Sequence, residues 1–157
     1  MKKILSPLGL FLLMTAAYAA TNPPAATISL NDFKLVGDLS GDQAGFTLTA
    51  TAQVEGAGGG SLDLLSGAVA LTDAPAQPQW RIRVEGNRYV AVFDHGGKFS
   101  LQLKFTAAVR RNEPWKAVEF RVAPSLLQPL VLRGLGADAQ FEFPGAARFE
   151  RKGADFT

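Results

Sequence analysis

The sequence predicts an all-β domain, an antiparallel β-sandwich of about eight short strands, with a small closed β-barrel as the alternative. Apolar and polar residues alternate with a period of two along several segments, which is typical of strands with one buried face. Clusters of Gly, Pro, Asn and Asp separate these segments at intervals of about ten residues. No segment has the apolar spacing of an amphipathic helix. Periodicity alone does not separate the sandwich from the barrel.

Residues 1–19 are predicted to be a cleaved secretory signal peptide. Lys2 and Lys3 precede a short apolar stretch, and Ala17-Tyr18-Ala19 places small residues where signal peptidase cleaves. The apolar stretch contains Pro7 and is short for a membrane span of about 20 residues, so we do not expect the mature chain to be integral to the membrane. The protein is therefore predicted to be exported, to the periplasm or the extracellular space.

A Pro-rich linker over residues 20–25 is expected to lead into a single β domain over residues 26–157. The chain ends at Thr157, shortly after the turn residue Gly153, where a strand would only just have begun. Two interpretations stay open. Either the last strand is frayed, or these residues are the N-terminal module of a longer protein.

The first strand of the domain is expected to change its phase part-way along. Ile28 and Leu30 alternate with polar neighbours, and after Asn31-Asp32 the apolar face continues with Phe33 and Leu35. Such a change predicts a bend or a β-bulge.

The rest of the first half predicts three strands and a loop. Residues 46–55 alternate apolar residues with polar ones, mostly Thr, which indicates a half-buried strand. Gly56–Gly60 is expected to be a loop, because glycine loses more backbone entropy on folding than any other residue. Two short strands, around Leu62–Leu64 and Val69–Leu71, are separated by Ser66-Gly67.

The second half begins with a predicted β-hairpin. Trp80–Val84 and Tyr89–Phe93 flank a Gly86-Asn87 turn, and the return segment is apolar on both faces, so it is expected to be a central strand. The longest alternation, over residues 98–110, predicts another strand and excludes a helix there.

The remaining segments have weaker patterns. We expect a turn over Arg111–Pro114, a strand over Val118–Val122, and one helical turn before a short strand within Leu126–Leu132. Phe141 with Phe143, and Phe149 with Phe156, indicate short strands near the C-terminus.

The charge balance argues against a nucleic-acid partner. The 16 Lys and Arg residues exceed the 14 Asp and Glu residues by two, and the signal peptide carries two bases, Lys2 and Lys3, and no acid. The mature chain is therefore neutral and lacks the excess of bases that neutralises phosphates. Within it, residues 20–78 hold six acids and one base, and residues 79–157 hold thirteen bases and eight acids. This asymmetry favours two halves whose fields cancel, with a basic binding face as the alternative.

No catalytic, cofactor or metal site is predicted, and the domain is not expected to be an enzyme. The chain has no cysteine, which excludes disulfides, thiol nucleophiles and cysteine-ligated metals. His95 follows Asp94 in a Gly-rich turn, and a triad with Ser100 or Ser125 can be drawn, but no nucleophile elbow accompanies it. We expect His95 to lie in a solvated hairpin turn.

A possible calcium loop is also disfavoured. Asp38, Ser40 and Asp42 occupy the first oxygen-ligand positions of an EF-hand-like loop, but Gln43 replaces the required Gly and Thr49 the bidentate Glu. An Asx-type turn is the expected structure.

Three aromatic residues are candidates for a platform that stacks sugar rings. Trp80 is in phase with Ile82 and Val84, so it is expected to lie in the core, whereas Trp115 follows Pro114 in a predicted turn and is expected to be exposed. Tyr89 is the third candidate.

The candidate partner-binding residues are bases on the polar phases of the later strands, together with Trp115. They are Arg81, Arg83, Lys98, Lys104, Arg110, Arg111, Trp115, Lys116 and Arg121. If their strands pair with one another, these residues form one basic stripe.

The expected function is that of an exported, non-catalytic β-module that serves binding or assembly in the bacterial cell envelope through this basic face. Its expected partner is an envelope protein or an anionic envelope surface. The alternative is a periplasmic carrier that holds a hydrophobic ligand in a barrel or cup, because the chain contains 11 Phe residues and an apolar segment at Tyr89–Phe93.

Overall fold

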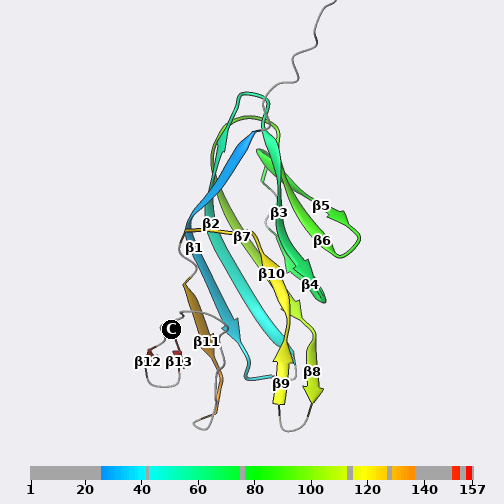
Figure 1. The fold of residues 1–157 in the computed structure, drawn as a ribbon, viewed down its shortest axis with the longest axis vertical. Helices are drawn as coiled ribbons and strands as arrows, with labels where there is room; N and C mark the ends of the chain where they lie inside the picture. The colour runs from blue at the N-terminus through cyan, green and yellow to red at the C-terminus, as the bar shows by residue number, and fades with distance from the viewer. Residues whose placement is uncertain are drawn as a thin grey trace, which may run out of the picture.

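The fold is an all-β sandwich, as predicted (Figure 1). The computed structural model describes residues 26–41, 43–74, 77–112, 115–126, 129–136, 150–152 and 155–156. These residues form two main sheets and a small hairpin, and they contain no helix, hence no helix able to span a membrane. The alternative of a closed barrel is wrong, because each main sheet ends in edge strands.

The larger sheet has seven strands. In the order in which they pair, they are β12 (Arg151–Lys152), β13 (Asp155–Phe156), β11 (Leu130–Arg133), β1 (Thr27–Asp38), β2 (Ala44–Glu55), β7 (Gly97–Ala107) and β4 (Val69–Asp73). All neighbours are antiparallel except β1 and β11, which are parallel, with Leu35 opposite Leu130.

The smaller sheet has four antiparallel strands. They are β10 (Phe120–Val122), β3 (Gly60–Gly67), β6 (Arg88–Phe93) and β5 (Trp80–Glu85). A separate hairpin of β8 (Val109–Asn112) and β9 (Trp115–Val118) links β7 of the larger sheet to β10 of the smaller one (Figure 1). The chain also passes from one sheet to the other between β3 and β4.

The phase change predicted in the first strand is confirmed as a bulge in β1. The register between β1 and β2 shifts between Asn31 and Lys34, and Asp32 has a φ of 50°. Because of the bulge, Leu30 and Phe33 are both buried although they are an odd number of residues apart.

Aromatic side chains fill the space between the sheets. Phe46 of β2 stacks on Phe105 of β7 with ring centroids 5.3 Å apart, and Phe120 of β10 packs edge-on against both rings, at 4.8 and 5.3 Å. Phe93 and Phe99 form a second contact, at 4.9 Å. These phenylalanines, which had suggested a ligand-binding interior, therefore pack against one another in the core.

The predicted hairpin is confirmed as β5 and β6. Glu85 faces Arg88 across the Gly86-Asn87 turn, and β6 lies between β3 and β5. Its central position explains why Val90 and Ala91, on opposite faces of β6, are both buried.

Several predicted boundaries are wrong by a few residues. Gly60 is the first residue of β3 and pairs with Phe93, so the loop is shorter than predicted. The long strand predicted over residues 98–110 is divided at Ala108, where the N–H donates to the Ala68 carbonyl (2.9 Å) and the chain leaves the larger sheet. Glu119 divides the strand predicted over Val118–Val122 in the same way.

The predicted turn over Arg111–Pro114 is also shorter in the structure. Arg111 and Asn112 belong to β8, and Trp115 begins β9. The described part of Leu126–Leu132 contains no helical turn and enters β11 at Leu130. The predictions for residues 1–25, Glu113-Pro114 and residues 137–149 lie outside the described residues.

Candidate functional site

The predicted basic residues do not form one stripe. Arg81 and Arg83 lie on β5, Lys98 and Lys104 on β7, Arg110 and Arg111 on β8, Trp115 and Lys116 on β9, and Arg121 on β10. Among the described residues, strands β5, β7 and β10 do not pair with one another or with β8 or β9. Strands β8 and β9 pair with each other. The condition for a single stripe is therefore not met, since the strand order separates these residues among the two sheets and the small hairpin.

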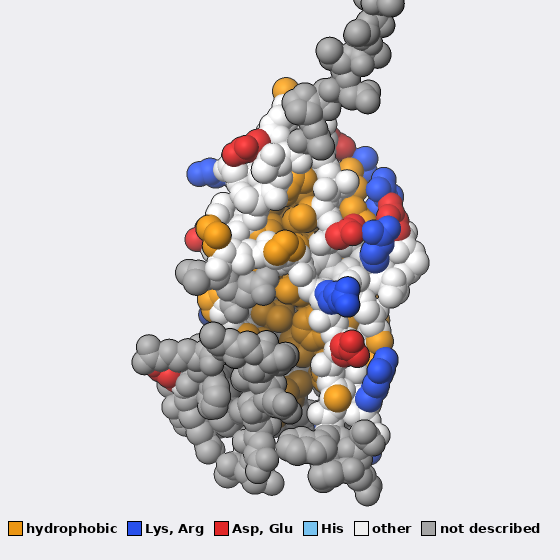
Figure 2. Space-filling model, in the orientation of Figure 1, with side chains coloured by type: hydrophobic (Ala, Val, Ile, Leu, Met, Phe, Trp, Pro, Cys, Tyr) orange, Lys and Arg blue, Asp and Glu red, His pale blue; other side chains and the backbone are white. Residues whose placement is uncertain are grey.

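Most of the described basic side chains have acidic partners. Arg81 pairs with Asp94 at 2.6 Å, and Lys104 pairs with Asp73 at 3.3 Å. Arg111 also has an interaction partner. The side chain of Trp115 is not among the side chains that the structure describes. Figure 2 shows this mixture, with basic and acidic side chains interspersed along the side of the molecule that carries β5 and β6 in Figure 1.

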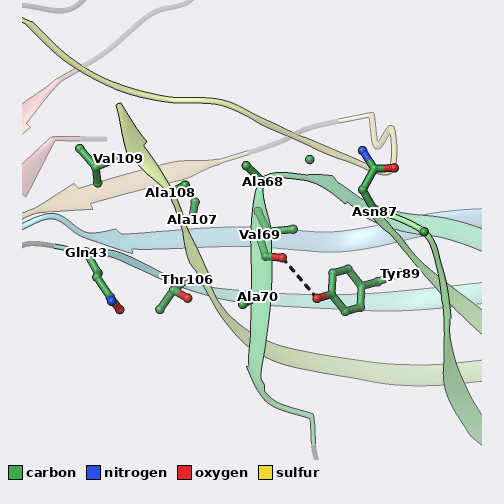
Figure 3. Close-up of a pocket in the computed structure, with 12 residues that line it drawn as sticks. Gln43, Ala68, Val69, Ala70, Asn87, Tyr89, Thr106, Ala107, Ala108 and Val109 are labelled. Carbon is green, nitrogen blue, oxygen red and sulfur yellow. Dashed lines mark hydrogen bonds between the residues drawn. The ribbon is translucent and has the colours of Figure 1, made fainter. Parts of the chain in front are cut away.

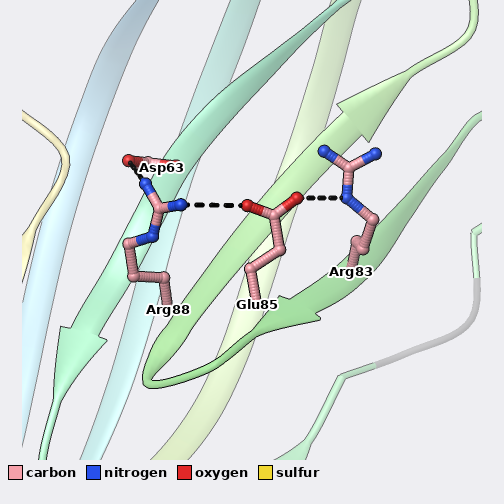
Figure 4. Close-up of polar contacts among 4 residues, drawn as sticks. All are labelled: Asp63, Arg83, Glu85 and Arg88. Atoms are coloured by element: carbon pink, nitrogen blue, oxygen red, sulfur yellow. Dashed lines mark hydrogen bonds and ion pairs between the residues drawn. The ribbon is translucent and has the colours of Figure 1, made fainter.

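The largest of these ion-pair groups is centred on Arg88, which is not among the predicted binding residues. Its guanidinium donates to Asp63 at 2.8 Å and to Glu85 at 3.0 Å, and Glu85 also accepts from Arg83 at 2.7 Å (Figure 4). The sequence predicts one contact of this group, that of Glu85 with Arg88, because residues that flank a two-residue hairpin turn face each other. These pairs are exposed and contribute only about 0–1 kcal/mol each.

Two of the predicted residues, Arg110 and Arg121, meet in a concave site. We call this site the arginine cleft. It has a volume of about 470 Å³ and is lined by Ser66, Gly67, Ala68, Asn87, Arg110, Glu119, Phe120 and Arg121. The cleft thus draws on the end of β3, the turn between β5 and β6, and strands β8 and β10.

The position of β10 in the cleft depends on Phe120. This ring packs on Phe46 and Phe105 in the core, while its neighbours Glu119 and Arg121 are exposed. Across the strands, Phe120 pairs with Gly67, where φ is 124° and an added Cβ would lie 3.1 Å from the Cα of Phe120. Glycine thus allows the close approach of β3 and β10 at the floor of the cleft.

The arginine cleft can accept an anionic group. Arg110 and Glu119 are 3.7 Å apart and their side chains are 72% and 81% exposed, so this pair is loose and solvated. The lining contains two guanidinium groups and one carboxylate, which leaves an excess of one positive charge in the cleft. Guanidinium N–H groups form bidentate hydrogen bonds with carboxylate or phosphate, and the Asn87 amide and Ser66 hydroxyl add further polar groups.

The residues considered for catalysis make other contacts. His95 is exposed, with its Nδ1 2.8 Å from the Gly96 carbonyl, and its ring packs on Phe99. The Asp94 carboxylate is paired with Arg81, and the Ser125 hydroxyl donates to the Leu30 carbonyl at 3.1 Å. The triad with Ser125 is therefore not assembled. Among the described residues, no group of three His, Asp or Glu residues could hold a metal.

The predicted Asx-type turn is present at Asp38. Its Oδ1 accepts hydrogen bonds from the backbone N–H of Ser40 at 3.0 Å and from the Ser40 hydroxyl at 2.6 Å. These hydrogen bonds, first that of the side chain and then that of the backbone, hold the pKa of Asp38 below its ordinary value. Asp42, the third residue of the possible calcium loop, lies outside the description.

A Ser40→Ala variant tests this assignment. Loss of the hydroxyl donor is expected to raise the pKa of Asp38 toward its ordinary value, as measured by NMR titration of the carboxyl carbon. Because the folded-state pKa is depressed, the stabilisation exists above the unfolded-state pKa and is lost as the pH falls through the folded-state value. An unchanged pKa in the variant would contradict the role of this hydroxyl.

The aromatic residues do not form a sugar-binding platform. Trp80 is 5% exposed and lies in the core, as predicted, with its Nε1 unpartnered among the described residues. Tyr89 is half-buried, and its hydroxyl contacts the backbone of β4. Two of the three rings are therefore turned inward.

Comparison with known proteins identifies no family. No protein-family model and no curated protein matches the sequence. Two solved structures are weakly similar: a two-domain M1 zinc metallopeptidase bound to L-arginine, and an M1 zinc metallopeptidase from Deinococcus radiodurans bound to a Tyr-Ser-Ala substrate. Each is 14% identical over 82% of this chain, with TM-scores of 0.39 and 0.38, and this chain spans 38% and 37% of their lengths. Similarity this low carries no argument about activity.

Proposed function

We propose that this protein is an exported, non-catalytic β-module that binds an acidic partner protein in the bacterial cell envelope. The observation that carries the proposal is the arginine cleft, where Arg110 and Arg121 line a concave site beside Asn87 and Ser66. A side-chain carboxylate of a partner would enter this cleft and accept paired hydrogen bonds from the guanidinium groups.

The shape of the cleft favours a protein partner over a membrane. A flat anionic surface is best met by many bases spread over an equally flat face. In this chain, many bases elsewhere are paired, such as Arg81 with Asp94 and Lys104 with Asp73, and the cleft is concave. Export is inferred from the N-terminal sequence.

A double variant tests this function. Arg110→Ser with Arg121→Ser is expected to weaken the binding of a fluorescein-labelled hexaglutamate peptide about tenfold, which corresponds to about 1.4 kcal/mol. The reason is that each lost guanidinium removes charge-assisted hydrogen bonds to carboxylates. Fluorescence anisotropy at low and physiological salt measures the dissociation constant.

The matched control removes the same charge from another surface. Arg81→Ser with Arg83→Ser changes two arginines on β5 that are paired with Asp94 and Glu85, and is expected to change the affinity less than twofold. Equal losses in the two double variants would contradict a specific cleft. The two double variants are also compared for binding to phosphatidylglycerol vesicles. If both lose vesicle binding equally, relative to the unchanged protein, an anionic membrane surface is favoured as the partner instead.

A further inference from the structure

The larger sheet ends in a short strand with a free edge. β4 pairs with β7 on one side, and no described strand pairs with its other side. Unpaired N–H and C=O groups on such an edge can template the addition of another strand. Proteins usually cover or block such edges. The contacts that the β4 edge makes therefore show how this chain protects it.

In this structure, one side chain from the other sheet occupies the β4 edge. The Leu71 N–H donates to the Tyr89 hydroxyl at 3.3 Å. This hydroxyl donates to the Val69 carbonyl, also at 3.3 Å (Figure 3). The hydroxyl thus takes the place that the backbone of a neighbouring strand would have. Both contacts are long for hydrogen bonds, which have their optima below about 3.0 Å, so a strand with better geometry would replace them.

The inward face of the hairpin above this edge is incompletely covered. Trp80, Ile82 and Val84 point to the same face of β5, and their burial falls along the strand, from buried to half-buried to 62% exposed. Val84 pairs directly with Tyr89, whose hydroxyl reaches the β4 edge. The uncovered end of this face therefore lies over the position next to β4, where an added strand would cover it.

A groove surrounds the start of β4 and reaches its free edge, and we call it the edge groove. It has a volume of about 640 Å³ and is bordered by Asn87 and Tyr89 on the free side of β4 and by Gln43, Thr106 and Val109 on the side of β7 (Figure 3). No charged side chain lines it. The edge groove and the arginine cleft share Gly67, Ala68 and Asn87, so they adjoin.

We propose that the β4 edge binds an extended segment of a partner polypeptide as an additional strand, in place of the Tyr89 hydroxyl. The segment alternates apolar residues, which cover Val84, with small uncharged residues, because the edge groove carries no charge to pair with. An acidic residue flanking the segment would reach Arg110 and Arg121, a part of the inference that rests on the proposed function.

Two variants of Leu71 test the added strand. Leu71→Pro removes the N–H that points away from β7, whereas Leu71→Ala keeps it and controls for the lost side chain. The probe is a phage-displayed library of random decapeptides, selected on the full chain. We expect the selected peptides to alternate apolar residues with small uncharged residues. We also expect them to bind the Leu71→Pro variant at least tenfold more weakly than the Leu71→Ala variant, as measured by fluorescence anisotropy.

Tyr89→Phe supplies a change in the opposite direction. Removal of the hydroxyl leaves the Val69 carbonyl and Leu71 N–H without their competitor, so the selected peptides are expected to bind about fivefold more tightly to this variant. A purely structural role of the hydroxyl would leave peptide affinity unchanged or lower it. Backbone N-methylation at alternate peptide positions is expected to abolish binding, because strand addition depends on main-chain hydrogen bonds.

Three further outcomes would overturn the inference. The first is a failure to select any peptide, and the second is equal peptide affinity for Leu71→Pro and Leu71→Ala. The third is a dimer of the chain alone in analytical ultracentrifugation that Leu71→Pro abolishes and Leu71→Ala keeps, because a second copy would then occupy the edge. The arginine cleft is tested separately, since Arg110→Ser with Arg121→Ser is expected to weaken only peptides with an acidic flank.

Discussion

Replacing Phe105 with alanine is expected to lower the free energy of unfolding by about 3–5 kcal/mol. Phe105 is 1% exposed and packs against the rings of both Phe46 and Phe120, each with its centroid 5.3 Å away. The truncation would leave a cavity beside two rings that belong to different sheets, Phe46 of β2 and Phe120 of β10, and such a site cannot collapse without moving the backbone. Unfolding in guanidinium chloride, followed by tryptophan fluorescence, measures the loss.

The same substitution is expected to affect the arginine cleft. Phe120 packs on Phe105 and carries Glu119 and Arg121 on either side, so a looser ring contact would loosen β10. Leu126→Ala is the control, because this side chain is 96% exposed and its removal is expected to cost less than about 0.5 kcal/mol. A loss below about 1 kcal/mol for Phe105→Ala would show that this cluster does not hold the sheets together.

Gly59→Ala is expected to destabilise the fold by about 3 kcal/mol. Gly59 has a φ of 72°, a conformation that residues with a Cβ rarely adopt. An added Cβ would also clash with the Phe93 carbonyl oxygen and with the backbone of Asp94 and His95. Because these neighbours are backbone atoms at the end of β6 and in the turn that follows it, they cannot rotate away.

The neighbouring glycine provides the matched control. Gly58 has no positive φ, and nothing lies within 4 Å of the Cβ that alanine would add. Gly58→Ala is therefore expected to be neutral or to stabilise the fold by up to about 1 kcal/mol, since it restricts the unfolded chain. Thermal unfolding of both variants measures the difference, and equal melting temperatures would contradict the close packing of the two loops.

The sequence predicted strands better than it predicted their partners. The bulge in β1, the half-buried strand β2 and the hairpin of β5 and β6 were all visible as alternation or as turn residues, because the burial of a strand face is written in its own residues. The divisions at Ala108 and Glu119 were not visible. They arise where the chain leaves one sheet for the other, and alternation continues across them.

The candidate sites show the same limit. Arg110 and Arg121 were predicted as binding residues, but Ser66 and Asn87 were missed, because they come from a strand end and a turn more distant in the sequence. A basic stripe was expected from residues that share a polar phase, although polar phase does not specify which strands are neighbours. The pairing of Glu85 with Arg88 could have been predicted from the two-residue turn between them.

The sequence by itself determined the fold class and the inward face of the main strands, since these depend on composition and on a local period of two. The tertiary structure decided the order of the strands, the parallel pairing of β1 with β11, and the contact of Tyr89 with the β4 edge. The physical reason is that strand order is set by the joint packing of two sheets around one core. Groups that meet only through that packing, such as the two arginines of the cleft, carry no shared local pattern.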